Sequence, residues 1–596
     1  MLIKPIALTL VQLLGSTNEQ FIIPSYQRRY SWRKQQVWEL LDDIHLIEGT
    51  DTHLLGSIVC LIGPHSPSLN ELELVDGQQR LTTLCILLEC LRERFVQLDQ
   101  TDMVHDITRL LTARAFGGPS QPKIKLETLD ADDFRSLAGS NSQNLDHPIG
   151  NRTLQEAFLR TREWLSGYAD DELSHFTYKL LNQTIIVRLD VSDAKDAFKL
   201  FETINNRGLK LSATDLIKNF MLGNAARFGT SELEDAKKSW SKLTAYLDGA
   251  DSDSFFRYFL ISKLHTRLTM SGVVYQFQAY FMNEVAEASK LPDRHWYAYE
   301  EEWEDEEQVE DEGAGETTKP SLEPHPKMSF NEFLHQLVLA SKAYGEILRA
   351  ETGIPKIDRH LRHLRQIKSA QSYGYLMHLR TGGIDEKTFV KVLKLTENFI
   401  LRRHVCRERA NETESLFAHL CAVDPRNPLE DTIIAYREAC PVDEKFRDEF
   451  RVAQFTSNIL ERARYCLEQL ELSKHGDHLE LGILGTDAVH VEHIIPKQIK
   501  SKKSKDEFGD WPAYLGERAL SRHPQYVHRI GNLTLFAGTL NIVASNNPFT
   551  YKKGGYSQSS ILMTKELARE NDFRFKEVEA RSAVLAERAV LLWPAP

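Results

Sequence analysis

The 596-residue sequence has no run of 18 uncharged apolar residues, so no helix is expected to span a membrane. Its seven cysteines form no C-x-x-C pair, which argues against a thiolate zinc site and favours reduced thiols. It has no G-x-x-x-x-G-K-S/T motif, so any nucleotide site differs from a Walker P-loop. Residues 1–15 are apolar but lack the basic region and cleavage site of a signal peptide, and are expected to form an opening helix. These absences favour a cytoplasmic protein with no membrane partner.

Basic residues are absent from one stretch that accounts for most of the net charge of −12. Residues 300–316 contain 11 acidic residues, and without them the net charge is near −1. Residues 493–556 instead contain ten Lys or Arg against four Asp or Glu, which permits an anionic partner. We expect residues 300–325 to form a solvated acidic loop, with mimicry of DNA as the alternative.

The length is too great for one hydrophobic core and predicts an α+β chain of three domains. Helical and extended patterns alternate over residues 1–228. Residues 229–425 have helical periodicity and form a predicted connector that includes the acidic loop. Residues 426–596 turn to short strands and loops, with a closing helix at 565–592.

The first domain is expected to contain several elements that its hydrophobic pattern defines. Helices are predicted at residues 33–48, 80–95, 196–204 and 213–226, and strands at 53–62, 72–75 and 183–189.

Three motifs of this domain combine polar and aromatic residues. They are I-P-S-Y-Q-R-R-Y-S-W at residues 23–32, V-D-G-Q-Q-R-L-T-T-L at 75–84, and F-E-T-I-N-N-R-G-L-K-L-S-A-T-D-L-I-K-N at 201–219.

The second motif joins the end of a strand to the start of a helix. Backbone N–H groups at such a helix start bind anions, and Arg80 adds a two-pronged donor for phosphate. Asp76, before Gly77, could hold a divalent cation or orient water. Gln78 and Gln79 could read a base or position a nucleophile. The alternative is a tight turn in which a buried aspartate caps the helix.

The first and third motifs offer further polar groups. Tyr26, Gln27 and Arg28 belong to a mixture of aromatics and arginines that suits base stacking and phosphate contact. An edge loop that packs its rings on the core is the alternative. In the third motif, a turn at 205–208 and the helix carrying Lys218 could face one pocket, or Lys218 could form a surface pair with residue 215.

Near the end of the chain, H-V-E-H-I-I-P-K spans residues 490–497 and G-N-L-T-L-F spans 531–536. His493 is the predicted general base, because a neutral imidazole accepts a proton from water near pH 7. Glu492 is a predicted metal ligand. Asn532 is expected to fix the His493 ring through its amide oxygen.

Three further groups complete this predicted nuclease site. Asn541 is the second candidate metal ligand, and His490 is an additional or replacement ligand. Oxygen ligands of this kind suit Mg²⁺ or Mn²⁺. Lys552 and Lys553 are expected to hold the DNA backbone phosphate. A structural histidine cluster is the alternative.

A basic stretch, R-H-L-R-H-L-R-Q-I-K at residues 359–368, lies in the predicted connector. Its charged face could follow a DNA backbone, or it could simply be solvated.

The three N-terminal motifs, in this order, resemble the N-terminal domain of the GmrSD family of modification-dependent (type IV) restriction proteins. The resemblance implies a ParB/sulfiredoxin-like domain that binds and hydrolyses NTP with a divalent metal and senses modified DNA. Asp76, Gly77, Gln78, Gln79 and Arg80 would be its nucleotide-site residues. Tyr26, Gln27 and Arg28 would contact DNA.

The C-terminal motifs resemble the HNH (ββα-metal) nuclease domain that ends GmrSD proteins. This chain departs from common HNH sequences by having Glu492 where aspartate usually precedes the base. It also lacks zinc knuckles.

Together the two resemblances imply an NTP-controlled endonuclease of anti-phage defence that cuts modified double-stranded phage DNA, with a homodimer as one form. Fusion of both halves in one chain resembles the BrxU type, with the SspE type next. The alternatives are a phosphorothioate-sensing NTPase and nickase of the SspE type, and a nucleotide-switched DNA-binding protein that does not cleave.

Overall fold

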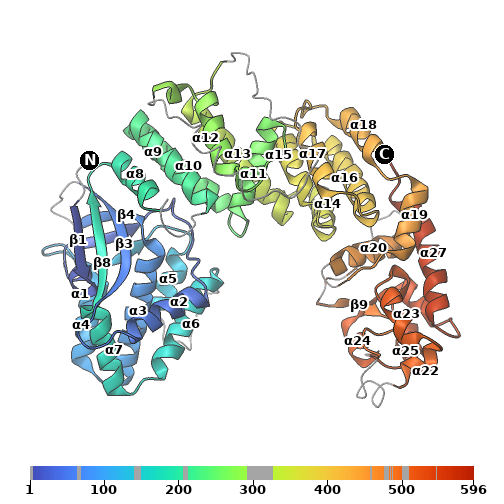
Figure 1. The fold of residues 1–596 in the computed structure, drawn as a ribbon, viewed down its shortest axis with the longest axis horizontal. Helices are drawn as coiled ribbons and strands as arrows, with labels where there is room; N and C mark the ends of the chain where they lie inside the picture. The colour runs from blue at the N-terminus through green and yellow to red at the C-terminus, as the bar shows by residue number, and fades with distance from the viewer. Residues whose placement is uncertain are drawn as a thin grey trace. The chain divides into compact units, whose positions relative to one another are not determined.

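The computed structural model describes residues 4–63, 69–139, 149–205, 212–290, 326–456, 459–475, 482–483, 485, 487–499, 509–544 and 546–596. The chain divides into two compact units (Figure 1). The N-terminal unit comprises Met1–Phe256 and Met270–Ser341, and the C-terminal unit comprises Arg257–Thr269 and Lys342–Pro596. The helices of the predicted connector are divided between them. The acidic stretch and the turn at 206–208 lie outside the described residues.

The N-terminal unit is built on a six-stranded sheet with the order β1-β8-β3-β4-β2-β7. β3 is parallel to β8, β2 is parallel to β4 and β7, and the β1–β8 and β3–β4 pairs are antiparallel. Its strands are β1 (Lys4–Thr9), β2 (Glu19–Ile23), β3 (His53–Ile62), β4 (Asn70–Asp76), β7 (Ile124–Leu126) and β8 (Thr184–Val191), with a separate pair β5 (Thr112–Arg114) and β6 (Ser120–Pro122).

Helices cover this sheet and continue beyond it. They are α1 (Leu10–Leu14), α2 (Lys34–His45), α3 (Gln78–Gln97), α4 (Thr101–Leu111), α5 (Ala131–Gly139), α6 (Arg152–Ser166), α7 (Asp170–Asn182), α8 (Ala194–Asn205), α9 (Ala213–Phe228), α10 (Thr230–Tyr246), α11 (Ser252–Leu264), α12 (Val273–Glu284) and α13 (Phe330–Arg349).

α3 is the central helix of the N-terminal core. Most of its residues are buried, because apolar side chains occupy nearly every face of the helix. They pack with residues of β2, β3 and β4 and of α2, α6 and α7 in one hydrophobic cluster. This burial fixes the position of the residues at the start of α3, where the second motif lies.

The opening-helix prediction for residues 1–15 is wrong. Lys4–Thr9 form β1, which pairs with β8, and α1 begins only at Leu10. The six residues of β1 gain ladder hydrogen bonds from β8 that the local pattern does not reveal.

The C-terminal unit is mainly helical (Figure 1), and its described residues include one strand pair. Its helices before the pair are α14 (Pro355–Gln366), α15 (Tyr373–Thr381), α16 (Glu386–Val405), α17 (Ala410–Leu420), α18 (Leu429–Ala439), α19 (Asp443–Val452) and α20 (Leu460–Leu472). The strands β9 (Val489–His493) and β10 (Leu533–Ala537) are antiparallel, with α22 (Trp511–Leu515) and α23 (Ala519–Tyr526) between them and α24 (Gly538–Ala544) directly after β10.

The chain then continues through α25 (Phe549–Ser557), α26 (Leu562–Leu567) and α27 (Phe575–Leu592). The single closing helix predicted at 565–592 is therefore two helices. The break contains Phe573, which is buried in the cluster formed by Ile494, Ile495 and their neighbours.

All seven cysteines are free, and all but Cys440 are buried. Burial raises the thiol pKa of Cys60, Cys85, Cys406 and Cys421 to about 12. Among the helices in the described ranges, none has the length and apolar character needed to cross a bilayer.

Candidate functional site

The second motif joins β4 to α3 through a single glycine. Gly77 adopts φ 88°, and a Cβ there would lie 2.5 Å from Cγ2 of Ile58. The Gly77 N–H donates to Oδ1 of Asp76 at 2.7 Å. The aspartate is therefore held at the helix start, as the sequence predicts.

Arg80 lies in the first turn of α3, and its side chain contacts β3. Its Nη1 donates to the Ser57 carbonyl at 2.7 Å. The guanidinium packs against Gly56. A Cβ at residue 56 would lie only 2.9 Å from Nη2, so glycine leaves the space that Arg80 occupies. Burial lowers the Arg80 pKa, and the nearby Asp76 charge opposes that change. The two charged groups of the motif are thus within electrostatic reach of each other.

The third motif reaches the first through Lys218 on α9. Lys218 Nζ donates to Gln27 Oε1 at 2.7 Å and lies 3.6 Å from Oδ1 of Asp215. Arg28 Nη1 lies 3.8 Å from the other Asp215 oxygen. Because Lys218 is only 4% exposed and Asp215 only 7%, the alternative of a surface pair is wrong.

This charge cluster also extends to the second motif. Burial lowers the pKa of Lys218, and the charges of Asp215 and Asp76 offset this decrease only in part. Burial alone would raise the pKa of Asp215, but Lys218 and Arg28 hold it below its usual value. Three segments, around residues 28, 76 and 215–218 of the sequence, thus contribute to one cluster of charges.

Two residues of the first motif that were predicted to contact DNA form internal hydrogen bonds instead. The Tyr26 hydroxyl is buried and donates to Glu73 Oε1 at 2.6 Å. Gln27 Nε2 donates to the carbonyls of Leu74 and Val75, each at 3.0 Å. Tyr26 and Gln27 are therefore not exposed to DNA, and the prediction that they bind it is wrong.

Gln79 is also structural. Its Oε1 accepts from the Ser31 N–H at 2.8 Å and its Nε2 donates to the Arg29 carbonyl at 3.2 Å. The amide group therefore anchors the first motif to α3. Both polar atoms of the Gln79 amide therefore bond to the protein backbone, whereas the sequence suggested that this side chain could contact a base. Among the predicted DNA contacts of the first motif, only Arg28 keeps a substantially exposed side chain, at 49%.

In the C-terminal unit, β9 and β10 bring the two predicted motifs together. His493 pairs with Leu533 and Glu492 with Thr534. Asn532 is fully buried at the start of β10. Its Oδ1 accepts from the Ile495 N–H at 2.8 Å, and its Nδ2 donates to the Ile495 and Val527 carbonyls at 2.9 Å.

Asn532 therefore fixes the backbone that follows His493 and does not bond to its ring. The predicted amide–imidazole contact is wrong, because both polar atoms of the amide are used by backbone groups. The ring of His493 meets a different partner, His528, with 3.3 Å between Nε2 and Nδ1.

Burial lowers the His493 pKa to about 3, and the nearby positive charge of Lys497 adds to the effect. The imidazole is therefore neutral at physiological pH, as the predicted base requires, although a pKa this low makes it a weaker base than a free imidazole. The third histidine nearby, His523, bonds through Nε2 to the Pro496 carbonyl at 2.8 Å and so supports the loop. His528 follows His493 by 35 residues in the sequence, and only the fold brings the two rings together.

Lys552 is not available for a DNA phosphate, contrary to prediction. Its ammonium is buried, donates to Glu492 Oε1, and donates to the His493 carbonyl at 3.0 Å. Burial acts to raise the Glu492 pKa, and the ion pair with Lys552 opposes it. Lys553, the next residue, is partly exposed and remains a candidate for phosphate contact.

The other predicted metal ligands lie on and beside α24. His490 and Glu492 are two residues apart on β9 and so share one face. The His490 ring lies against the start of α24, where a Cβ on Gly538 would be 3.0 Å from its Cε1. Asn541 is one turn further along the same helix. Carboxylate, amide and imidazole groups fit a divalent cation in kind, although Lys552 already occupies one Glu492 oxygen.

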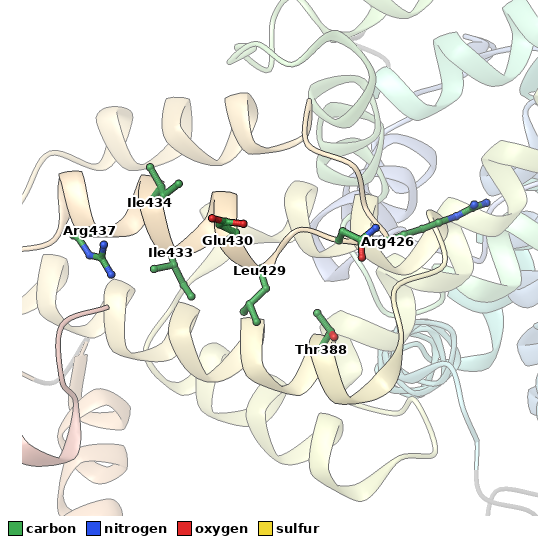
Figure 2. A pocket seen from close by; sticks show the side chains of 8 residues that line it. Thr388, Arg426, Leu429, Glu430, Ile433, Ile434 and Arg437 are labelled. Carbon is green, nitrogen blue, oxygen red and sulfur yellow. The ribbon is translucent and has the colours of Figure 1, made fainter.

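A pocket of about 530 Å³ lies elsewhere in the C-terminal unit, where α18 faces the start of α16 (Figure 2). Its lining combines the aliphatic side chains of Leu429, Ile433 and Ile434 with charged and polar ones. It contains none of the predicted site residues, so its position gives no support to a catalytic role.

Comparison with known families matches both halves of the chain. Residues 10–222 match the N-terminal domain of GmrSD restriction endonuclease, and residues 440–588 match the C-terminal domain of GmrSD restriction endonucleases. No curated protein matches the sequence. The N-terminal charge cluster lies within the first matched region, and the residues around His493 lie within the second. Since these domains stand in family order and together span more than half of the residues, the chain belongs to the GmrSD family of type IV restriction endonucleases, whose substrate is DNA.

Proposed function

We propose that the chain is a modification-dependent endonuclease that cuts phage DNA with a metal-dependent HNH site under the control of NTP. The observation that carries the nuclease proposal is the ββα order of β9, β10 and α24 around a neutral His493 adjacent to Glu492. In this proposal the domain is an HNH domain, and the six-stranded N-terminal unit is a ParB/sulfiredoxin-like domain.

In the nuclease site, His493 accepts the proton of the attacking water. His528 orients its ring, and Asn532 holds the backbone after it. Glu492 and Asn541 hold Mg²⁺ or Mn²⁺, with His490 as a further ligand. Such an ion supplies electrostatic stabilisation of the scissile phosphate. Lys552 keeps Glu492 ionised inside the protein, because its ammonium offsets the cost of burying the carboxylate.

In the N-terminal unit, Arg80 and Lys218 supply positive charge for the phosphates of an NTP, and Asp76 supplies a carboxylate for its divalent ion. The N–H group of Gln78 lies at the start of α3, which favours anions. Gln79 holds the loop that carries Arg28 in place.

The remaining parts of the proposal follow the family. The fused chain is of the BrxU type, acts in the cytoplasm on modified double-stranded DNA, and uses a homodimer as a controlled state. Arg28 and Lys553 are the proposed contacts to DNA. The SspE-type nickase and the non-cleaving DNA-binding protein are the rival outcomes of the experiment below.

The test is cleavage of glucosylated, methylated, phosphorothioate and unmodified DNA by the full chain, with and without NTP and Mg²⁺. We expect cleavage of one modified class only, lost by about 100-fold or more in His493→Ala and at least tenfold in Arg80→Ala. His105→Ala and Arg135→Ala are exposed controls and should match the wild type.

The outcomes separate the rivals. Nicking restricted to phosphorothioate DNA would establish the SspE type. Binding without any metal-dependent cleavage by the wild type would establish the DNA-binding protein. Equal cleavage with and without NTP would refute nucleotide control, and full activity of His493→Ala would remove it as the base.

A further inference from the structure

Two histidines of the basic stretch at 359–368 face inward. His360 and His363 lie three residues apart on α14, so both project toward α16. There they meet the carboxylate of Glu397, with 2.5 Å from His360 Nδ1 to Oε1 and 3.2 Å from His363 Nδ1 to Oε2. Among the described residues, this is the one place where three such side chains lie within metal-ligand distance of one another.

In the part of the chain that the structure describes, no lysine or arginine forms an ion pair with the buried carboxylate of Glu397. Glu397 is 5% exposed, and its ion pairs in the structure are those with the two histidines. A buried carboxylate requires compensating positive charge. Protonation of the two imidazoles or a bound divalent cation can each supply it, and the metal titration below distinguishes the two.

A third helix, α20, also contributes a hydrogen bond to the cluster of His360, His363 and Glu397. The Tyr465 hydroxyl on α20 donates to Glu397 Oε2 at 3.2 Å and accepts from Trp593 Nε1 at 2.9 Å. A metal ligand supported by further hydrogen bonds is the usual arrangement of a protein metal site.

We propose that His360, His363 and Glu397 bind a divalent transition-metal ion of the Zn²⁺ class and that this ion ties α14 to α16. Two imidazoles and one carboxylate are a common protein ligand set for Zn²⁺. Imidazole nitrogens favour Zn²⁺ over Mg²⁺, which prefers oxygen ligands. The site is therefore chemically distinct from the proposed nuclease ion.

The spacing fits such an ion. Ligands at about 2.0–2.1 Å from a tetrahedral Zn²⁺ stand roughly 3.3 Å apart. The contact of His363 with Glu397 already has nearly this length, and that of His360 must open by less than about 1 Å. The partly exposed side of His363 leaves a direction from which water can supply a fourth ligand.

The test uses the full chain stripped of metal with a chelator and then titrated with Co²⁺ or Zn²⁺. We expect a visible absorption band of tetrahedral Co²⁺, one tightly bound Zn²⁺ per chain by elemental analysis, and a rise in melting temperature with Zn²⁺. The His493→Ala and Glu492→Gln variants should keep all three signals, which separates this ion from the nuclease ion.

His363→Asn and Glu397→Gln should weaken Zn²⁺ binding more than about tenfold and remove the thermal shift. His378→Asn is the matched control, because His378 is also a half-buried histidine of this unit but lies outside the cluster. If the stripped wild type shows neither the Co²⁺ band nor stoichiometric Zn²⁺, or if His363→Asn binds Zn²⁺ as the wild type does, the proposal is wrong. These readouts on the wild type do not depend on how well a variant folds.

Discussion

At the scale of single residues, the ion pair between Glu492 and Lys552 changes how the C-terminal motif is understood. The sequence places a carboxylate beside a histidine and two lysines 60 residues later. The structure buries one of those lysines against the carboxylate and leaves its neighbour, Lys553, partly exposed. Two adjacent residues of the same type therefore have different roles.

We expect Lys552→Met to destabilise the C-terminal unit by about 3–5 kcal/mol, because it leaves the Glu492 carboxylate buried without its partner. Lys553→Met, the matched control, should change stability by less than about 0.5 kcal/mol. Thermal unfolding followed by calorimetry measures both, and adding Glu492→Gln to Lys552→Met should recover much of the loss. Equal effects of the two lysine variants would show that the ion pair does not stabilise the fold.

At the scale of elements, the junction of β4 and α3 positions the N-terminal cluster. Gly77→Ala should destabilise the N-terminal unit by about 1–3 kcal/mol, since the new Cβ combines left-handed backbone strain with overlap against Ile58. Gly49→Ala is the control, because Gly49 also has positive φ but has open space around it. Denaturant unfolding of both variants separates the two costs. A Gly77→Ala loss no larger than that of Gly49→Ala would exclude the steric component.

The elements themselves were largely predictable, whereas their partners were not. β3 spans the predicted residues, and α2, α3, α8, α9 and β8 lie within a few residues of prediction, because hydrophobic periodicity is local. The edge strand β1 was missed because its partner β8 lies about 180 residues away.

The same limit applies to the candidate sites. Their motifs were identified from sequence, but the bonds from Tyr26 to Glu73, Lys218 to Gln27 and Lys552 to Glu492 join residues 47, 191 and 60 positions apart. Whether a polar side chain faces a ligand or the core depends on these distant partners. The histidines of α14 illustrate this point. The stretch 359–368 reads as a basic surface in the sequence, yet two of its residues, His360 and His363, form part of a buried cluster.

At the scale of the whole molecule, acid should weaken the C-terminal unit through His404. This histidine on α16 accepts from Arg462 of α20, which also donates to the Ile367 carbonyl after α14. Burial, reinforced by the Arg462 charge, lowers the His404 pKa to about 4. The unfolded chain has a pKa near 6.5 and so binds the proton more readily between these values.

Stability from His404 is therefore complete above about pH 6.5 and declines as the pH falls to about 4, by roughly 3 kcal/mol at most. His404→Asn keeps an acceptor for Arg462 and should remove this part of the pH dependence. The measurement is the unfolding free energy of wild type and variant across pH 4–8. Parallel curves for the two proteins would mean that His404 does not titrate as inferred.

The buried thiols have a practical consequence for studying movement in this enzyme. A thiol reacts with maleimide or iodoacetamide as the thiolate, and a thiol pKa near 12 leaves almost none at neutral pH. The six buried cysteines should therefore not react with such reagents while the fold persists. After replacement of the partly exposed Cys440 alone, one cysteine introduced at an exposed position such as Phe116 could carry a fluorophore or spin label.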